Sequence, residues 1–153
     1  MTPDVMLILL LSWLFTLILA VVWVLKESDK QKLLIFERKI LRRIYGAIKI
    51  SNNEWRIRTN DEINKIIKNR TIVNFIQAQR ISWFGHINRM PDESLVKRIY
   101  KWQPIGARPT GRPKNRWEDN VRNDLRNMKI QNCLQQTKDR MSWKKIVEKA
   151  KAF

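Results

Sequence analysis

The chain has 153 residues, which is enough for one small domain with appendages. Its 31 basic and 14 acidic residues give a formal net charge of +17. Such a charge predicts a polyanionic partner, either nucleic acid or anionic lipid. One cysteine and one histidine exclude an internal disulfide and a cysteine-based zinc site, so we expect no metal and no cofactor.

The first predicted element is apolar, because Val5 to Leu25 runs for 21 residues without a charge. At a rise of about 1.5 Å per residue, a helix of this length spans a hydrocarbon core of about 30 Å. The segment lacks the basic start of a cleaved signal peptide. We therefore expect residues 1–29 to be a transmembrane signal-anchor with its flank, and residues 30–153 to form a basic helical domain.

The flanks of this segment predict its orientation. Lysines and arginines follow it closely, whereas the residues before it carry none. By the positive-inside rule, the expected product is a single-pass membrane protein whose C-terminal domain is cytosolic. If the segment is not used as an anchor, a nuclear location is the alternative.

Behind the segment, apolar residues at helical spacing predict an all-α domain of about five helices. Residues 47–60 lack a long period, and the pair Asn52-Asn53 indicates a turn, so a loop or a short extended piece is expected there. The helical patterns cover residues 33–45, a short helix after Asn60, 71–90, 94–102, 115–128 and 138–152.

A basic stripe runs from Arg80 to Trp117, with nine basic residues against two acidic ones. It also holds three of the seven tryptophans. Cations interleaved with aromatic residues are typical of a surface that meets phosphates. Trp83 and Trp117 are expected in the core, and Trp102 is the candidate for stacking on bases. The candidate phosphate contacts are Arg80, Arg89, Lys97, Arg98, Lys101, Arg108, Arg112, Lys114 and Arg116.

Prolines and glycines exclude a helix through residues 103–114 and favour an extended backbone. Gly111-Arg112-Pro113 is similar to the core of an AT-hook, in which an extended arginine enters a narrow minor groove. Thr110 stands where the flanking arginine of that motif is usual. Groove insertion, loose phosphate contact and a plain exposed loop stay open as alternatives.

Several motifs from Leu33 to Ala150 resemble the C-terminal tail of the reverse-transcriptase polyprotein of non-LTR (LINE-type) retrotransposons. That tail has a WxGH…RM helix, a GRPxxRW loop, an acidic amphipathic helix and a closing DRxxW helix, in this order. The resemblance implies descent from such an element. The matching residues are Trp83, Gly85, His86, Arg89, Met90, Gly111, Arg112, Pro113, Arg116, Trp117, Asp119, Asp124, Leu125, Asp139, Arg140 and Trp143.

The catalytic parts of such a polyprotein have no counterpart in this sequence. Reverse transcription needs carboxylates that hold two metal ions, and the family's aspartate pair precedes this tail. No Asp-Asp dipeptide, phosphate-binding loop or nucleophile elbow occurs here. We therefore expect no enzyme activity.

Three hypotheses follow from the sequence. The first is a membrane-anchored, nucleic-acid-binding remnant of a LINE-type reverse transcriptase that contacts the phosphates of RNA or DNA. The second is a basic protein of the membrane surface that binds anionic lipid. The third is a translated transposon relic without a function.

Overall fold

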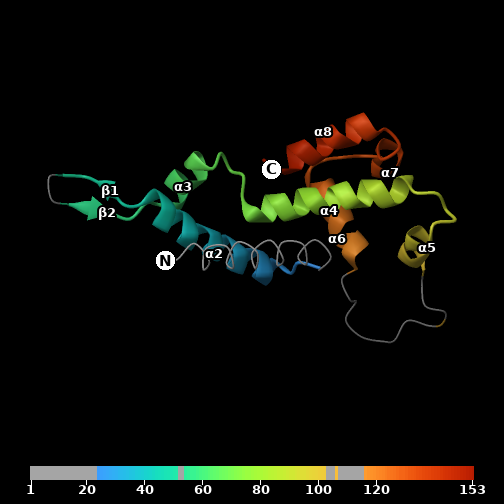
Figure 1. The fold of residues 1–153 in the computed structure, drawn as a ribbon, viewed down its shortest axis with the longest axis horizontal. Helices are drawn as coiled ribbons and strands as arrows, with labels where there is room; N and C mark the ends of the chain where they lie inside the picture. Colours follow the sequence, from blue (N-terminus) through green and yellow to red (C-terminus); the bar gives the residue numbers. More distant parts are fainter. Residues whose placement is uncertain (1–23, 52–53, 103–105, 107–115) are drawn as a thin grey trace, which may run out of the picture.

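The computed structural model describes residues 24–51, 54–102, 106 and 116–153. Within them the chain is mostly helical, with a short antiparallel hairpin near one end (Figure 1). The elements are α2 (Glu27–Tyr45), β1 (Ile48–Lys49), β2 (Trp55–Arg56), α3 (Asn60–Ile66), α4 (Ile72–Arg89), α5 (Leu95–Lys101), α6 (Trp117–Asn127), α7 (Cys133–Gln136) and α8 (Arg140–Ala150).

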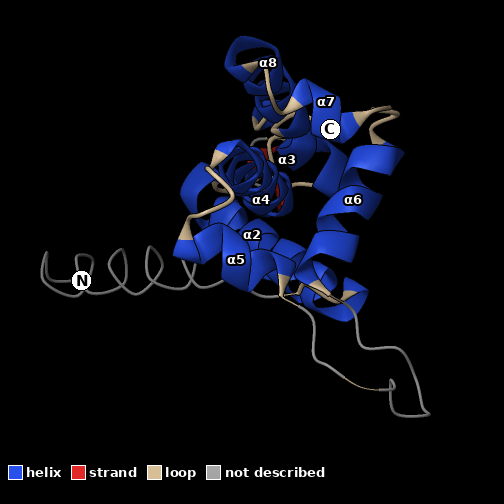
Figure 2. Cartoon of the chain, turned by 90° about the vertical axis from the view of Figure 1, so that its right-hand side faces the viewer, coloured by secondary structure: helices blue, strands red, loops and turns tan. Residues whose placement is uncertain are grey.

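Helix α4 is the central element, with α8 on one side and α6 crossing it (Figure 1, Figure 2). Its start is set by Thr71, whose side chain accepts a hydrogen bond from the backbone N–H of Asn74 at 3.2 Å. It ends before Pro91, as the sequence predicts. The buried residues of the main core come from α4, α6, its C-cap and α8: Ala78, Ile81, Phe84, Val121, Leu125, Met128, Trp143 and Ala150.

A glycine lets α8 approach α4 closely. A Cβ atom on Gly85 would lie 2.0 Å from Nε1 of Trp143, far inside van der Waals contact. That nitrogen donates a hydrogen bond to the carbonyl oxygen of Ile81 at 3.0 Å. Glycine inside a helix costs about 1 kcal/mol relative to alanine. The close packing of a 2 % exposed indole offsets this cost.

A second apolar cluster joins the start of α2 to the start of α4. Leu25 is 7 % exposed and packs with Ile72, Val73 and Ile76. The same two helices are also joined by a hydrogen bond. A carboxylate oxygen of Glu37 accepts it from the backbone N–H of Ile72 at 2.8 Å. Partial burial raises the pKa of Glu37, and the bond from Ile72 acts in the opposite direction. The negative charge at the first turn of α4 also complements the dipole of that helix.

The prediction of a transmembrane helix is corrected. Among the helices of the described residues, none is long and apolar enough to cross a membrane. The predicted span, Val5 to Leu25, lies outside the described residues except for its last two. Of these, Leu25 is buried against α4, where it packs with protein side chains. The localisation as a single-pass membrane protein with a cytosolic domain depended on that span and is corrected with it.

The described residues behind that segment are mostly helical, as predicted, and Ile48–Lys49 and Trp55–Arg56 form a short strand pair where a loop or a short extended piece was expected. Strands β1 and β2 are antiparallel, with Ile48 opposite Arg56 and Lys49 opposite Trp55. The guanidinium of Arg56 donates to both carboxylate oxygens of Glu62, which fastens the hairpin to α3. Glu62 also completes a capping box with Thr59 at the start of α3. Further departures are α7, which was not predicted, and α2, which begins six residues before the expected helix.

Candidate nucleic-acid interface

The described part of the basic stripe lies on the second half of α4, on α5 and at the start of α6. Its cations share a helical scaffold, but they differ in what they contact. Some are used inside the protein, and others are exposed. Because a phosphate can be bound only by a group that it can reach, this division decides what the stripe can do.

Arg80 belongs to the buried group, since its side chain is 0 % exposed. It donates a hydrogen bond to the amide oxygen of Asn120 at 2.8 Å, and its guanidinium lies 5.9 Å from the ring centroid of Trp117. The Asp124 carboxylate lies 4.0 Å away. Burial lowers the pKa of Arg80 and raises that of Asp124, while each charge counteracts the shift of the other. Arg80 therefore joins α4 to α6 and offers nothing to a phosphate.

Two more of the predicted phosphate contacts, Arg89 and Lys97, are bound to backbone carbonyl oxygens. Arg89 donates to the carbonyl oxygen of Thr137 at 3.0 Å. The ammonium group of Lys97 donates to the carbonyl oxygens of Asn88 and Met90 at 3.2 and 2.6 Å. A cation at these last carbonyls of α4 also complements the helix dipole.

Asp92 forms ion pairs with two lysines of the basic stripe. Its carboxylate lies 2.7 Å from the ammonium group of Lys101 and 3.2 Å from that of Lys97. The hydrogen bond from Lys101, followed by that from Lys97, lowers the pKa of Asp92. Both lysines are therefore partly neutralised before any ligand arrives.

Arg98, Trp102 and Arg116 are exposed, and Arg98 and Arg116 make no side-chain hydrogen bond or ion pair within the described residues. Trp102 is 69 % exposed at the end of α5, so its ring faces are available to bases. Helix α5 also exposes Leu95, at 68 %, and Ile99, at 65 %. The predicted contacts Arg108, Arg112 and Lys114 lie outside the described residues.

The burial of the tryptophans differs from the prediction. Trp83 is 50 % exposed and makes an edge contact with His86, with ring centroids 5.8 Å apart, so its assignment to the core was wrong. Trp117 is partly buried and packs against the main core. Tyr100 of α5 meets it edge-on, with ring centroids 6.3 Å apart, and so links α5 to α6. Trp83 and Trp102 are thus the exposed aromatic rings of the described stripe.

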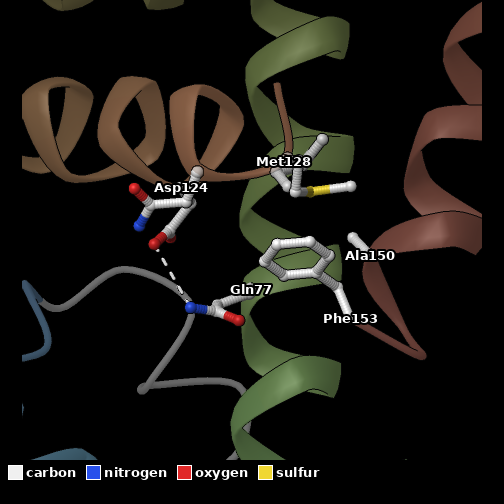
Figure 3. A pocket seen from close by; sticks show the side chains of 7 residues that line it. Gln77, Asp124, Met128, Ala150 and Phe153 are labelled. Carbon is white, nitrogen blue, oxygen red and sulfur yellow. Dashed lines mark hydrogen bonds between the residues drawn. The ribbon is translucent and has the colours of Figure 1, made fainter. Parts of the chain in front are cut away.

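A small cavity lies between α4, α6 and the end of the chain. Its lining includes Gln77, Asp124, Met128, Ala150 and Phe153, and the amide of Gln77 donates to Asp124 at 3.2 Å (Figure 3). Its volume of about 30 Å³ has room for roughly one water molecule. Binding sites for small molecules usually measure about 300–1,000 Å³. This cavity is therefore a packing gap beside a buried carboxylate.

A second group of exposed cations, which the sequence did not indicate, lies on α8. Lys144, Lys145 and Lys149 are exposed and have no hydrogen bond or ion pair within the described residues. Their signal in the sequence is weak, since acidic residues are interspersed and no proline-rich loop accompanies them. Asp139 caps this helix by accepting from the backbone N–H groups of Met141 and Ser142.

Comparison with known proteins gives one informative similarity. Over 104 residues the chain is 24% identical to an uncharacterized transposon-derived protein of Caenorhabditis elegans. The match covers 67% of this chain and 37% of that protein, so the chain spans well under two thirds of its relative's length. No family model matches the chain, and no solved structure matches it. The similarity indicates a transposon origin for this sequence.

Proposed function

We propose that this chain is a non-catalytic nucleic-acid-binding remnant of a LINE-type reverse transcriptase. The observation that carries the proposal is the group of three exposed side chains Arg98, Trp102 and Arg116, which the structure leaves without internal hydrogen bonds or ion pairs among the described residues. Exposed guanidinium groups can contact phosphates, and an exposed indole can stack on bases. The descent from a LINE-type element rests on the motifs quoted above, and the similarity to a transposon-derived protein supports it at a coarser level.

The net charge of +17 supplies the long-range part of this binding. Each phosphate that a protein neutralises releases counterions, so the logarithm of affinity falls linearly with the logarithm of salt concentration. The slope is about −0.9 per phosphate for duplex DNA and about −0.7 for single strands. The slope of affinity against salt concentration therefore reports the number of phosphate contacts. A change in this slope tests whether an individual cation makes such a contact.

The test is fluorescence anisotropy of the full chain with labelled duplex and single-stranded oligonucleotides between 50 and 200 mM salt. We expect binding with a steep salt slope, and the double variant Arg98→Gln/Arg116→Gln should flatten that slope by about two. The matched control is Lys32→Gln/Lys49→Gln, which removes the same charge from exposed positions on α2 and β1. Binding that ignores salt, or equal effects of the two variants, would contradict the proposal.

A membrane-surface role is a different outcome of the same measurement. Flotation with vesicles of neutral or acidic lipid tests it directly. If the chain binds acidic vesicles and fails to bind either oligonucleotide, the proposal is wrong and the lipid hypothesis replaces it.

A further inference from the structure

Helix α8 carries exposed cations in two columns along its length. Arg140 and Lys144 are four residues apart, and so are Lys145 and Lys149, so each pair lies on neighbouring turns of the helix. All four side chains are exposed, and none makes a hydrogen bond or an ion pair with the described residues. The opposite side of α8 is apolar and buries Trp143 and Ala150 against α4. The helix is therefore fixed by one face and presents cations on the other.

One acidic residue, Glu148, is exposed among these cations. Its carboxylate is bound by Lys151 at 2.7 Å, and the hydrogen bond from Lys151 lowers the pKa of Glu148. We call the four exposed cations Arg140, Lys144, Lys145 and Lys149 of α8 the distal basic surface.

This arrangement is unfavourable for α8 in isolation. Like charges four residues apart repel each other along a helix. Arg140 also stands in the first turn, where a positive charge opposes the helix dipole. In the basic stripe, by contrast, Lys97 and Lys101 share the carboxylate of Asp92. A bound polyanion would relieve the repulsion on α8, as Asp92 relieves it in the stripe.

The distal basic surface and the exposed part of the stripe face different directions. In both views α8 lies on one side of α4, and α5, which carries Arg98 and leads to Trp102, lies on the other (Figure 1, Figure 2). The buried core formed by α4, α6 and α8 separates them. One straight nucleic-acid segment therefore cannot contact both groups of cations at once.

We propose that the distal basic surface is a second phosphate-binding surface, so that one molecule holds two nucleic-acid segments on opposite sides of α4. This inference rests on the proposed function for its ligand, and it adds the second site. The recognised chemistry is the phosphate backbone, because the residues that define this surface are all cations.

The first test uses the full chain with the triple variant Lys144→Gln/Lys145→Gln/Lys149→Gln and the salt titration described above. We expect the variant to bind duplex DNA with a salt slope flatter by about two to three. The matched control is Lys32→Gln/Lys39→Gln/Lys49→Gln, which removes equal charge from α2 and β1. Thermal unfolding of each variant should show a melting temperature no lower than that of the native chain, since none of these lysines is buried.

The second test measures bridging. A biotinylated duplex on beads and a fluorescent duplex in solution are mixed with the protein, and fluorescence retained on the beads is measured. The native chain should retain the fluorescent duplex. The α8 variant and Arg98→Gln/Arg116→Gln should each still bind one duplex, and each should lose most of the bridging.

The outcomes separate the two proposals. If the native chain binds no nucleic acid, the proposed function fails and this inference fails with it. If the native chain binds, but the α8 variant keeps its salt slope and bridges normally, only the second surface is wrong. Loss of acidic-vesicle binding by the α8 variant, with its nucleic-acid binding and bridging intact, would assign the surface to lipid and also overturn the inference.

Discussion

The basic stripe and the distal basic surface are both rich in cations, but the fold engages these cations differently. In the stripe, Arg80 is buried beside α6, Arg89 and Lys97 donate to backbone carbonyl oxygens, and Lys101 is paired with Asp92. On α8, by contrast, no described partner takes up the exposed lysines. The comparison teaches that a local excess of cations does not by itself locate a polyanion site. A cation can bind a phosphate only where the fold does not already pair it with a carboxylate or a carbonyl oxygen.

The largest expected effect comes from Trp143, on which the position of the distal basic surface depends. Trp143→Ala should lower the free energy of unfolding by about 3–5 kcal/mol, because it leaves a cavity and removes the bond to Ile81. Urea denaturation measures this value. Trp102→Ala is the control and should change stability by less than about 0.5 kcal/mol, since Trp102 is 69 % exposed. Equal losses in both variants would contradict this packing.

Within the basic stripe, Arg80 and Arg98 carry the same charge, but Arg80 is buried and Arg98 is exposed. Arg80→Ala leaves the carboxylate of Asp124 buried without its cation and should cost about 3 kcal/mol of stability. Arg98→Ala should cost less than about 0.5 kcal/mol. The double variant Arg80→Met/Asp124→Leu should regain most of the loss, because a buried ion pair can be replaced by apolar side chains. Denaturant midpoints distinguish these expectations.

Asp92 offers a way to make the stripe resemble α8. Asp92→Asn removes the carboxylate that binds Lys97 and Lys101, so Lys101 becomes available to a phosphate. We expect tighter nucleic-acid binding and a salt slope steeper by about one. Glu54→Gln, which makes the same change in net charge near the hairpin, is the control. If both variants bind equally, pairing with Asp92 does not limit the stripe.

The smallest expected effect concerns Glu62, whose bond to Arg56 lies outside both basic regions. The hydrogen bond from Arg56 lowers the pKa of Glu62 to about 2 in the folded chain, from an ordinary value of 4.5. A lowered carboxyl pKa stabilises the fold above about pH 4.5, and this contribution is lost as the pH falls towards about 2. Native chain and Glu62→Gln should therefore differ in urea midpoint at pH 6 and converge near pH 2. A constant difference across this range would contradict the assignment.

The sequence predicts the parts of the fold that depend on local chemistry. The helical pattern of residues 71–90 corresponds to α4, which ends before Pro91, and the pattern of residues 138–152 corresponds to α8. These outcomes depend on residues only a few positions apart. Helical spacing also locates the other main helices, although it places the start of α2 too late.

Long-range contacts explain what the sequence could not show. Arg80 was expected to be exposed because it is charged, but α6 supplies partners for it 40 and more positions later. Trp83 was expected in the core because it lies near the apolar stripe of α4. Several elements cover α4, so its buried face is broad, and spacing alone does not define the edge on which Trp83 lies 50 % exposed. The sequence does not distinguish the unpaired cations of α8 from Lys97 and Lys101, which the fold pairs with Asp92.

The bond between Trp143 and Ile81 has a consequence for synthesis of the chain, because 62 positions separate its two residues. At about 5–20 residues per second, a ribosome needs roughly 3–12 s to travel from one to the other. During that interval nascent α4 exposes Ala78, Ile81 and Phe84 without the indole that later covers Gly85. A nascent chain paused there exposes these apolar side chains, and Trp143 can cover them only after α8 has been made and has left the ribosome.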